Sequence, residues 1–294
     1  MHRSRLRPRL PGAVESARRR LLDWHRRFTR FEPTSELSRL NSDPRPLVPV
    51  SPDMARFVEA AVHAARVTGG LVDPTLGREI RDAGYGRHHE RSLPLDLALR
   101  LNRRRAAARP HPSARWSKVS LASGDRIARP PGVELDSGGI AKGLFADLLG
   151  EVLAGYDAYA VDCAGDVRLG GAAGLPRPVR VAGPFGGEQL HEFELLDGAA
   201  ATSGISRRSW LDRDGRPAHH LLDPATGRPA FTGLVQATAL APTAIEAEAR
   251  AKAAVLDGPE RVDHWPQYGG LVVFDDGSHE AIEASAHLAL RVAA

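Results

Sequence analysis

The sequence is poor in cysteine and has no long apolar run. Cys163 is the only cysteine among 294 residues, so an internal disulfide is excluded and nothing indicates a secreted, disulfide-stapled domain. No apolar run approaches the roughly 20 residues that a membrane-spanning helix needs. The basic amino terminus also lacks the apolar core of a signal peptide. These absences favour a cytoplasmic protein without a transmembrane segment.

Lysine is scarce as well. Of 40 lysine and arginine residues, only Lys118, Lys142 and Lys252 are lysines. A guanidinium does not supply the compact charge and tunable pKa of an ammonium, so a lysine retained in such a chain is a candidate functional residue. The alternative for Lys118 is an ordinary surface position.

The positive charge is confined to one end of the chain. Residues 1–30 carry ten arginines against Glu15 and Asp23, which leaves the remaining residues slightly acidic. No basic face extends over the fold, so a nucleic-acid partner is not expected. We predict a disordered basic arm over 1–10 and a single domain over 11–294, because hydrophobic residues (42%) and charged residues (26%) are at globular levels.

The pattern of apolar residues predicts an α+β fold with a mixed, mostly antiparallel sheet and flanking helices. One helix is expected from Pro11 to about Thr29, and another from Thr243 to Asp257, where Thr243 and Glu246 form a capping box and Gly258 marks the end. Short apolar runs predict strands at 159–161, 179–181, 192–196, 234–240, 271–274 and 279–282.

An Arg-, Ala- and Pro-rich stretch over 87–115 is predicted to be a solvated insertion. It contains a helical pattern from Pro94 to Ala108. After it, Lys118 to Leu121 and Arg126 to Ala128 are predicted to form a hairpin.

The most informative stretch is ELDSGGIAKGLFAD, from Glu134 to Asp147. A carboxylate at Asp136 precedes a Ser-Gly-Gly turn, and Lys142 then enters a run with helical apolar spacing. A glycine-rich turn that opens a helix is suited to binding phosphate, because free N–H groups and the helix dipole favour an anion. The alternative is an ordinary loop before a helix with a solvated lysine.

Further corners place Asp, Ser or Thr beside Gly or Pro at the ends of predicted strands. Asp73 and Thr75 flank Pro74, and Thr202 precedes Ser203-Gly204. Tyr85, between glycines, either stacks on a planar ligand or plugs the edge of the core. His220 is a candidate general base, although His219 beside it leaves the choice between the two open. If these corners converge in space, they line a polar cleft suited to a nucleotide. The remaining corners are Gly165-Asp166 and Asp223-Pro224.

These motifs, taken together and in order, resemble those of the FAD:protein FMN transferases, the ApbE-like flavin transferases. The resemblance covers about residues 14–277 and is specific as an ordered set, whereas each piece alone is weak. The matching pieces are SELSRLN, GLVDPTLG, LDSGGIAKGLFAD, AGD, ATSG and HHLLDPATGRP.

The resemblance implies an activity and roles for individual residues. Such enzymes cleave FAD, release AMP and attach FMN through a phosphoester to a threonine of an acceptor flavoprotein. By analogy His220 is the base that deprotonates the threonine, and the backbone of Gly139 faces a magnesium ion. The residues expected at the FAD are Val72, Asp73 and Thr75 on the adenosine side, with Tyr85, Asp136, Lys142 and Thr202.

The chain departs from the family pattern at two places. Relatives carry an aspartate and, four residues later, a threonine as magnesium ligands, where this chain has Glu248 and Lys252. Glutamate can bind magnesium but an ammonium cannot. We therefore hypothesise that Lys252 partly replaces the metal and that Glu248 holds it; the alternative is an exposed ion pair. Relatives also open with a Gly-Thr strand, whereas this sequence begins almost at the following helix.

Three other functions remain open at this stage. Water in place of threonine would give hydrolysis of FAD to FMN and AMP. A flavin- or nucleotide-binding protein without turnover is favoured by the substitution at Lys252. An RNA- or membrane-associated protein acting through the arginine arm predicts strong salt dependence of binding.

Overall fold

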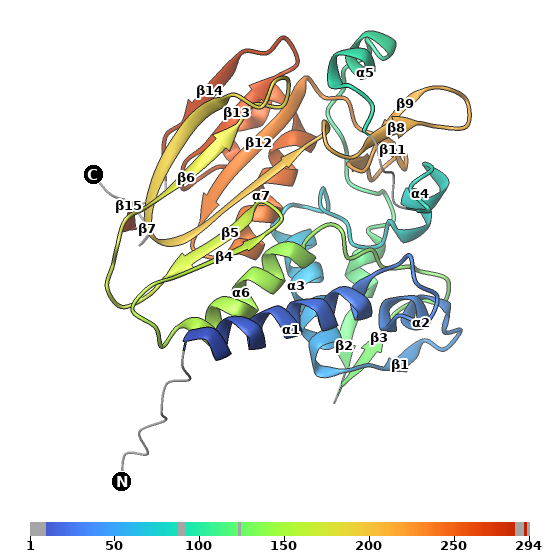
Figure 1. Ribbon diagram of the computed structural model, residues 1–294. Helices are drawn as coiled ribbons and strands as arrows, with labels where there is room; N and C mark the ends of the chain where they lie inside the picture. Colours follow the sequence, from blue (N-terminus) through green and yellow to red (C-terminus); the bar gives the residue numbers. More distant parts are fainter. Residues whose placement is uncertain (1–9, 88–91, 123–124, 286–290, 293–294) are drawn as a thin grey trace.

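The computed structural model describes residues 10–87, 92–122, 125–285 and 291–292. It shows an α+β protein in which a large antiparallel sheet lies beside a region of short helices and hairpins (Figure 1). The expected arm over 1–10 lies almost wholly outside the described residues. Among the residues described, none of the helices has the length and apolar character needed to span a bilayer.

The large sheet is built around one long strand, β7. Its spatial order is β14-β13-β12-β7-β5-β4, and β6 and β15 also pair with β7. Every recorded pair in this sheet is antiparallel, which agrees with the expected mostly antiparallel character, and the described strands include no parallel pair that would make the sheet mixed. The strands are β4 (Tyr159–Cys163), β5 (Asp166–Gly170), β6 (Arg177–Ala182), β7 (Gln189–Gly204), β12 (Leu234–Ala241), β13 (Gly270–Phe274), β14 (His279–Ile282) and β15 (Arg291–Val292).

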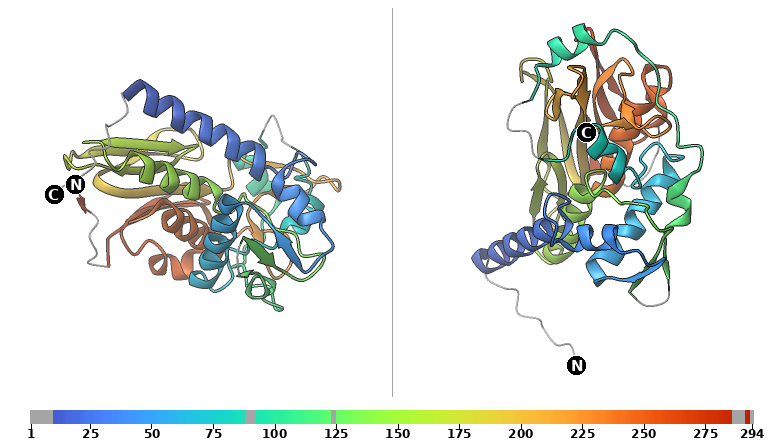
Figure 2. Two further views of the ribbon diagram at one scale, coloured as in Figure 1. Left: turned by 90° about the horizontal axis from the view of Figure 1, so that it is seen from below. Right: turned by 90° about the vertical axis from the view of Figure 1, so that its right-hand side faces the viewer.

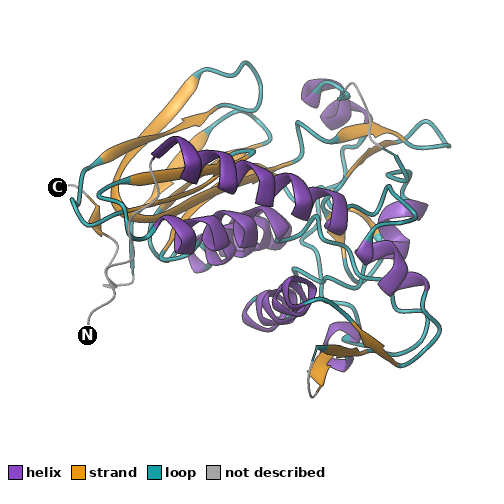
Figure 3. Ribbon diagram, turned by 60° about the horizontal axis from the view of Figure 1, so that its bottom comes forward, coloured by secondary structure: helices purple, strands orange, loops and turns teal. Residues whose placement is uncertain are grey.

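Three helices cover one face of this sheet. Helices α6 (Ala141–Leu153) and α7 (Ala244–Asp257) pack on the strands, and α1 (Leu10–Phe28) packs outside α6 (Figure 3). Six of the 14 residues of α7 are alanine and 11 of the 14 are buried, so the backbone of α7 lies close to the sheet. Chain segments that are distant in sequence thereby meet between α6 and α7.

The remaining elements form the other side of the molecule (Figure 2). They are small two- and three-stranded sheets, several short helices and the 16-residue helix α3. They are α2 (Glu36–Ser42), β1 (Leu47–Pro49), α3 (Pro52–Val67), α4 (Gly77–Asp82), α5 (Leu95–Leu101), η1 (Arg115–Lys118), β2 (Ser120–Ala122), β3 (Arg126–Ala128), β8 (Ser209–Leu211), β9 (Pro217–His219), β10 (Leu222–Asp223), β11 (Arg228–Pro229) and η2 (Pro259–His264).

Helices α6 and α7 cap each other. The Asp147 carboxylate on α6 accepts hydrogen bonds from the first N–H groups of α7, Ala244 N at 2.8 Å and Ile245 N at 3.0 Å. In return, Glu248 on α7 accepts from Gly143 N in the first turn of α6 at 2.8 Å. A carboxylate at a helix amino terminus satisfies free N–H groups and complements the helix dipole. The crossing of the two helices is therefore held by two charge-assisted contacts.

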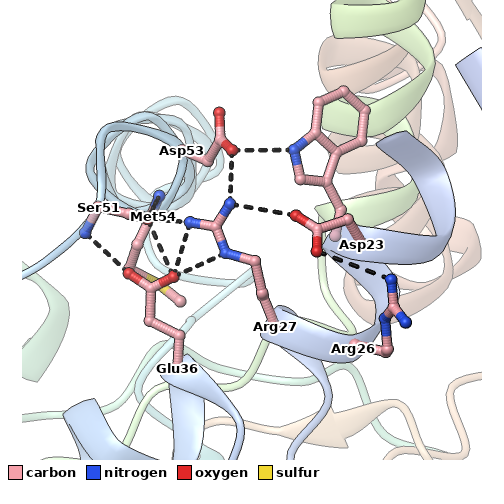
Figure 4. A network of polar contacts seen from close by, with 8 residues as sticks. Asp23, Arg26, Arg27, Glu36, Ser51, Asp53 and Met54 are labelled. Carbon is pink, nitrogen blue, oxygen red and sulfur yellow. Dashed lines mark hydrogen bonds and ion pairs between the residues drawn. The ribbon is translucent and has the colours of Figure 1, made fainter. Parts of the chain in front are cut away.

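The carboxyl end of α1 is anchored by a network around Arg27 (Figure 4). The guanidinium donates to Glu36 Oε2 at 2.8 Å and to Asp53 Oδ2 at 2.9 Å. Glu36 also accepts from the backbone N–H of Ser51 at 2.8 Å. One arginine thus joins α1 to the starts of α2 and α3. These contacts fix the position of the residues that follow α1 relative to those two helices.

Most of the expected elements are confirmed, and one helix is shorter than expected. Thr243 Oγ1 accepts from Glu246 N, and Gly258 ends α7 with a φ of 83°. The helix expected from Pro94 to Ala108 ends at Leu101. Beyond it the backbone is extended and bonds to distant segments, with Ala108 N donating to Leu256 O at 2.8 Å. Tertiary hydrogen bonds therefore override the helical propensity of the alanines there.

Candidate functional site

Two adjoining cavities lie where the helical layer meets the region of short elements. Their volumes are about 400 Å³ and 670 Å³. Five residues line both cavities and form the boundary between them: Gly138, Lys142, Arg208, His220 and Lys252. Lys142, Arg208 and Lys252 are cationic side chains, so the junction is suited to the anionic middle of a ligand that extends into both cavities.

The first cavity has mainly apolar walls, to which Phe28, Leu71 and Val72 contribute. Its rim includes Arg30, whose Nε lies 2.9 Å from Asp136 Oδ1. The Arg30 guanidinium also lies over the ring of Tyr85, 4.7 Å from its centre. An apolar slot with polar groups at its edge is suited to a planar heterocycle.

Tyr85 is packed by protein on more than one side. Its ring stacks on Trp210 with centres 5.0 Å apart, and the residue is only 7% exposed. Tyr85 lines the first cavity, but these contacts favour the interpretation that it supports the wall. Its contact with a ligand stays a prediction.

The corner at Asp73 presents a buried acceptor to the first cavity. Thr75 donates to Asp73 Oδ1 through its N–H at 2.8 Å and its hydroxyl at 2.6 Å. Asp73 Oδ2 is buried without a hydrogen-bond partner among the described residues. Burial raises the pKa of Asp73, against the hydrogen bonds from Thr75. Because a buried acceptor without a donor is unfavourable, this oxygen is suited to an N–H group of a ligand.

Two lysines and two carboxylates lie together at the junction. Lys142 Nζ is 2.7 Å from Asp166 Oδ2 and 3.6 Å from Glu248 Oε1. Lys252 Nζ is 2.7 Å from the same Glu248 oxygen. Asp166 and Glu248 have no exposed surface, and Lys252 is 5% exposed. The alternative of an exposed ion pair between Glu248 and Lys252 is therefore wrong.

The four groups shift one another's pKa. Burial lowers the pKa of Lys252 and is only partly offset by the charge of Glu248. Burial alone would raise the pKa of Glu248, but the charges of Lys252 and Lys142 outweigh it and lower that pKa. Burial, followed by repulsion from Glu248, raises the pKa of Asp166 to about 7. Lys142 and Lys252 line both cavities, and titratable groups with shifted pKa values beside a cavity are typical of functional sites.

The two adjacent histidines have different surroundings. His219 is 1% exposed, packs edge-on against Phe231 and lines neither cavity. His220 lines both cavities, and burial and then the Arg208 charge lower its pKa well below 6.5. His220 is therefore neutral near neutral pH and can accept a proton. The sequence left open which of the two histidines is the candidate base, and these surroundings favour His220.

The turn before α6 differs from the expected phosphate-binding turn. Neither Gly138 nor Gly139 has a positive φ. The N–H of Gly138 donates to Asp136 Oδ2 at 2.9 Å, and the N–H of Gly143 donates to Glu248. Internal carboxylates therefore take the donors that were expected for a ligand, and the basic side chains provide the anion site instead.

The side chains present do not fit a magnesium ion at Glu248. One Glu248 oxygen accepts from Lys252 and the other from Gly143. Among the described residues, no group of three His, Cys, Asp or Glu side chains is placed to hold a metal. Magnesium needs an octahedron of oxygen ligands, which an adjacent ammonium group opposes. Gly139 lines the first cavity, but Gly143 provides the backbone group at Glu248.

Most of the residues expected at the site do line the cavities. Asp136, Lys142, His220 and Lys252 line the first cavity, as do Val72, Asp73, Tyr85 and Gly139. Thr202 lines only the second cavity, and its hydroxyl is 2.8 Å from that of Thr238. Thr75 lines neither cavity, and its hydroxyl donates a hydrogen bond to Asp73, which lines the first cavity.

Sequence reasoning missed Arg30, Arg208 and Asp147. No carboxylate partner of the Arg208 guanidinium is found within the part of the chain that the structure describes. Arginine is so common in this chain that a single arginine gives no signal. Asp147 lay within the central stretch, but its contact with α7 depends on a tertiary crossing that spacing does not show.

The structure is that of an α+β protein with two adjoining cavities, whose basic boundary is suited to a phosphorylated ligand. Comparison with known proteins makes this class specific, because the sequence profile of the ApbE family matches residues 4–273. The chain belongs to the ApbE family.

The relatives share most of this chain. The FAD:protein FMN transferase of Treponema pallidum is 29% identical over 272 residues, which cover 83% of this chain and 71% of the relative. That of Chlamydia trachomatis is 31% identical over 206 residues, covering 69% and 61%. The crystal structure of the ApbE protein from Thermotoga maritima superposes with a TM-score of 0.75 at 25% identity, covering 96% of this chain and 92% of that protein.

Proposed function

We propose that this protein is a FAD:protein FMN transferase. The relatives that bear this name match most of the chain, and the site is suited to the substrate. The observation that carries the proposal is the boundary between the cavities, where His220 lies with Lys142, Lys252 and Arg208. A dinucleotide has its two phosphates between two ring systems, so a basic boundary between two cavities fits its shape.

The reaction exchanges the phosphoanhydride bond of FAD for a phosphoester bond to the acceptor. The hydroxyl oxygen of an acceptor threonine attacks the phosphorus of the FMN half of FAD. The bridging P–O bond of the pyrophosphate breaks, and AMP leaves with the bridging oxygen. The new Oγ–P bond joins FMN to the threonine. No group is oxidised or reduced.

We assign separate steps to the residues at the junction. His220 takes the proton of the threonine hydroxyl, for which its neutral form is needed. Lys142, Lys252 and Arg208 stabilise the charge on the transferred phosphoryl group and on the leaving phosphate. Asp73 Oδ2 accepts from a ligand N–H group in the first cavity. Asp136 fixes Arg30 at the rim of that cavity.

The second cavity is the proposed entry for the acceptor. It is lined by polar groups that include Thr202, Ser203 and Gln236. It meets the first cavity at His220, where a threonine hydroxyl and the pyrophosphate must come together. The proposed acceptor is a flavoprotein with an accessible threonine, and the names of the relatives indicate that the acceptor is a protein.

The proposal is tested by incubating the full chain with FAD, with and without an acceptor flavoprotein domain, and measuring AMP. AMP release that requires the acceptor supports transfer. AMP and free FMN at the same rate without acceptor would show hydrolysis. Bound FAD without any AMP would show a binding protein and overturn the proposal.

A further inference from the structure

The region where relatives are expected to hold a metal is filled by protein cations. Glu248 has no exposed surface, and each of its oxygens has a partner. Oε1 accepts from Lys252 Nζ at 2.7 Å and lies 3.6 Å from Lys142 Nζ, and Oε2 accepts from Gly143 N. A divalent ion on Oε1 would lie in contact with one ammonium and close to a second.

The charges within the cluster already balance. Above about pH 7, where Asp166 is ionised, Glu248 and Asp166 contribute two negative charges, and Lys142 and Lys252 contribute two positive charges. A buried ion cluster is most stable when its charges are paired and hydrogen-bonded. An added Mg²⁺ would leave the buried group with two unpaired positive charges, so it would have to displace an ammonium.

Lys252 is placed to contact a ligand as well as Glu248. Its ammonium has three N–H donors, of which the contact with Glu248 uses one. The side chain lines both cavities, as does that of Lys142. The two ammonium groups share one Glu248 oxygen, so Glu248 sets the spacing between them.

We propose that Lys252, held by Glu248 and paired with Lys142, is the built-in cation of this site and removes the need for a divalent metal. The inference rests on the proposed function, because the anion that the lysines bind is the pyrophosphate of FAD. Lys252 keeps its proton throughout and acts by charge and hydrogen bonding. Two ammonium groups supply the double positive charge that one Mg²⁺ would bring.

The first measurement is direct metal binding to the full chain. Mn²⁺ is used as a spectroscopic substitute for Mg²⁺, and its bound fraction is measured by electron paramagnetic resonance with and without FAD. The inference predicts no stoichiometric protein-bound Mn²⁺ that depends on Glu248. One Mn²⁺ per chain in the wild type, lost in Glu248→Gln, would overturn it.

The second measurement is AMP release from FAD in the presence of acceptor, in chelator and in Mg²⁺. We expect the wild-type rates to agree within about twofold, whereas a single cation of this kind contributes about 100-fold. Activity that disappears in chelator and returns with Mg²⁺ would overturn the inference. If no AMP appears under either condition, the proposed function fails, while the Mn²⁺ measurement still decides the role of Lys252.

Variants isolate the role of the ammonium. Lys252→Thr should lower AMP release by about 100-fold in chelator and recover part of it with Mg²⁺. Lys118→Thr is the matched control, because Lys118 is exposed and lines neither cavity; its rate should not change. The double variant Glu248→Gln with Lys252→Met removes both members of the buried ion pair. Because no unpaired charge is left buried, its loss of activity would not result from misfolding. This double variant should unfold cooperatively yet stay slow with or without Mg²⁺; wild-type rates in it would contradict the inference.

Discussion

His220 is the only imidazole that lines both cavities among the described residues, and its charge state decides its role. Because its pKa lies well below 6.5, the neutral base is already formed at physiological pH. We expect kcat/KM for transfer to stay level from about pH 7 to 8 and to fall only at lower pH. A rate that keeps rising through pH 8 would contradict this assignment.

Replacing His220 should separate binding from chemistry. His220→Ala should lower transfer by at least about 100-fold, because general base catalysis contributes that much. FAD binding, measured by fluorescence quenching, should change little because the lysines and Arg208 remain. A fully active His220→Ala would remove His220 from the base role.

His219 should act on stability instead. Its pKa in the folded protein is about 3 against an ordinary 6.5, because the ring is buried. Between these values the unfolded chain binds a proton and the native chain does not. The contribution of His219 to the free energy of unfolding is therefore fully present above pH 6.5. It is lost as the pH falls, by up to about 1.4 kcal/mol per pH unit.

The variant His219→Gln should lack this contribution to the slope. Denaturant unfolding at several pH values measures this slope. The pH values should lie between about 3, the pKa of His219 in the folded protein, and 6.5, its ordinary value. His279→Gln, at an exposed position in β14, is the control and should retain the wild-type slope. An unchanged slope in His219→Gln would mean that another group carries the acid sensitivity.

At the scale of elements, the crossing of α6 and α7 depends on Gly143. A Cβ there would lie 2.5 Å from Ala244 O and 2.8 Å from Ile245 N. We expect Gly143→Ala to destabilise the protein by about 1–3 kcal/mol, through overpacking that separates the helices. It should also weaken FAD binding, because Lys142 and Lys252 lie on the two helices.

Gly155→Ala provides the matched control for this prediction. Gly155 lies beyond the end of α6, and a Cβ there would contact nothing within 4 Å. Thermal unfolding of the two variants gives the comparison. Equal stabilities would show that the close approach of α6 to α7 is not needed.

The Arg27 network should matter both for folding and for the first cavity. Arg27→Met leaves Glu36 and Asp53 without their shared partner and should lower stability by about 1–2 kcal/mol. Because Phe28 and Arg30 follow directly in the chain, FAD affinity should fall too. Arg26→Met is the control: that side chain is 74% exposed and should change stability by less than about 0.5 kcal/mol. Equal effects of the two variants would contradict the anchoring role.

At the scale of the whole molecule, local sequence patterns predicted most helices and strands correctly. They did not predict the tertiary contacts between those elements. The class of fold, the helix after Thr243 and the antiparallel strands follow from periodicity and capping residues. The early end of the helix at Leu101 depends on hydrogen bonds to Phe231 and Leu256, which lie far away in sequence.

The site shows the same division. The corners with Asp73, Lys142 and His220 stood out because their residue types are rare or chemically distinctive, and all three line the first cavity. Arg30 and Arg208 could not be distinguished among many arginines. The hydrogen bond from Gly143 N to Glu248 forms only where α6 and α7 cross, and no sequence spacing encodes that crossing.

The central claim is that FMN moves as a phosphoester from FAD to a threonine of another protein. The most direct test is the intact mass of an acceptor domain after incubation with this protein and FAD, beside the same domain with its target threonine changed to alanine. The account predicts a gain equal to FMN less one water on the threonine form and none on the alanine form. Free FMN and AMP with no gain in mass on either form would contradict it.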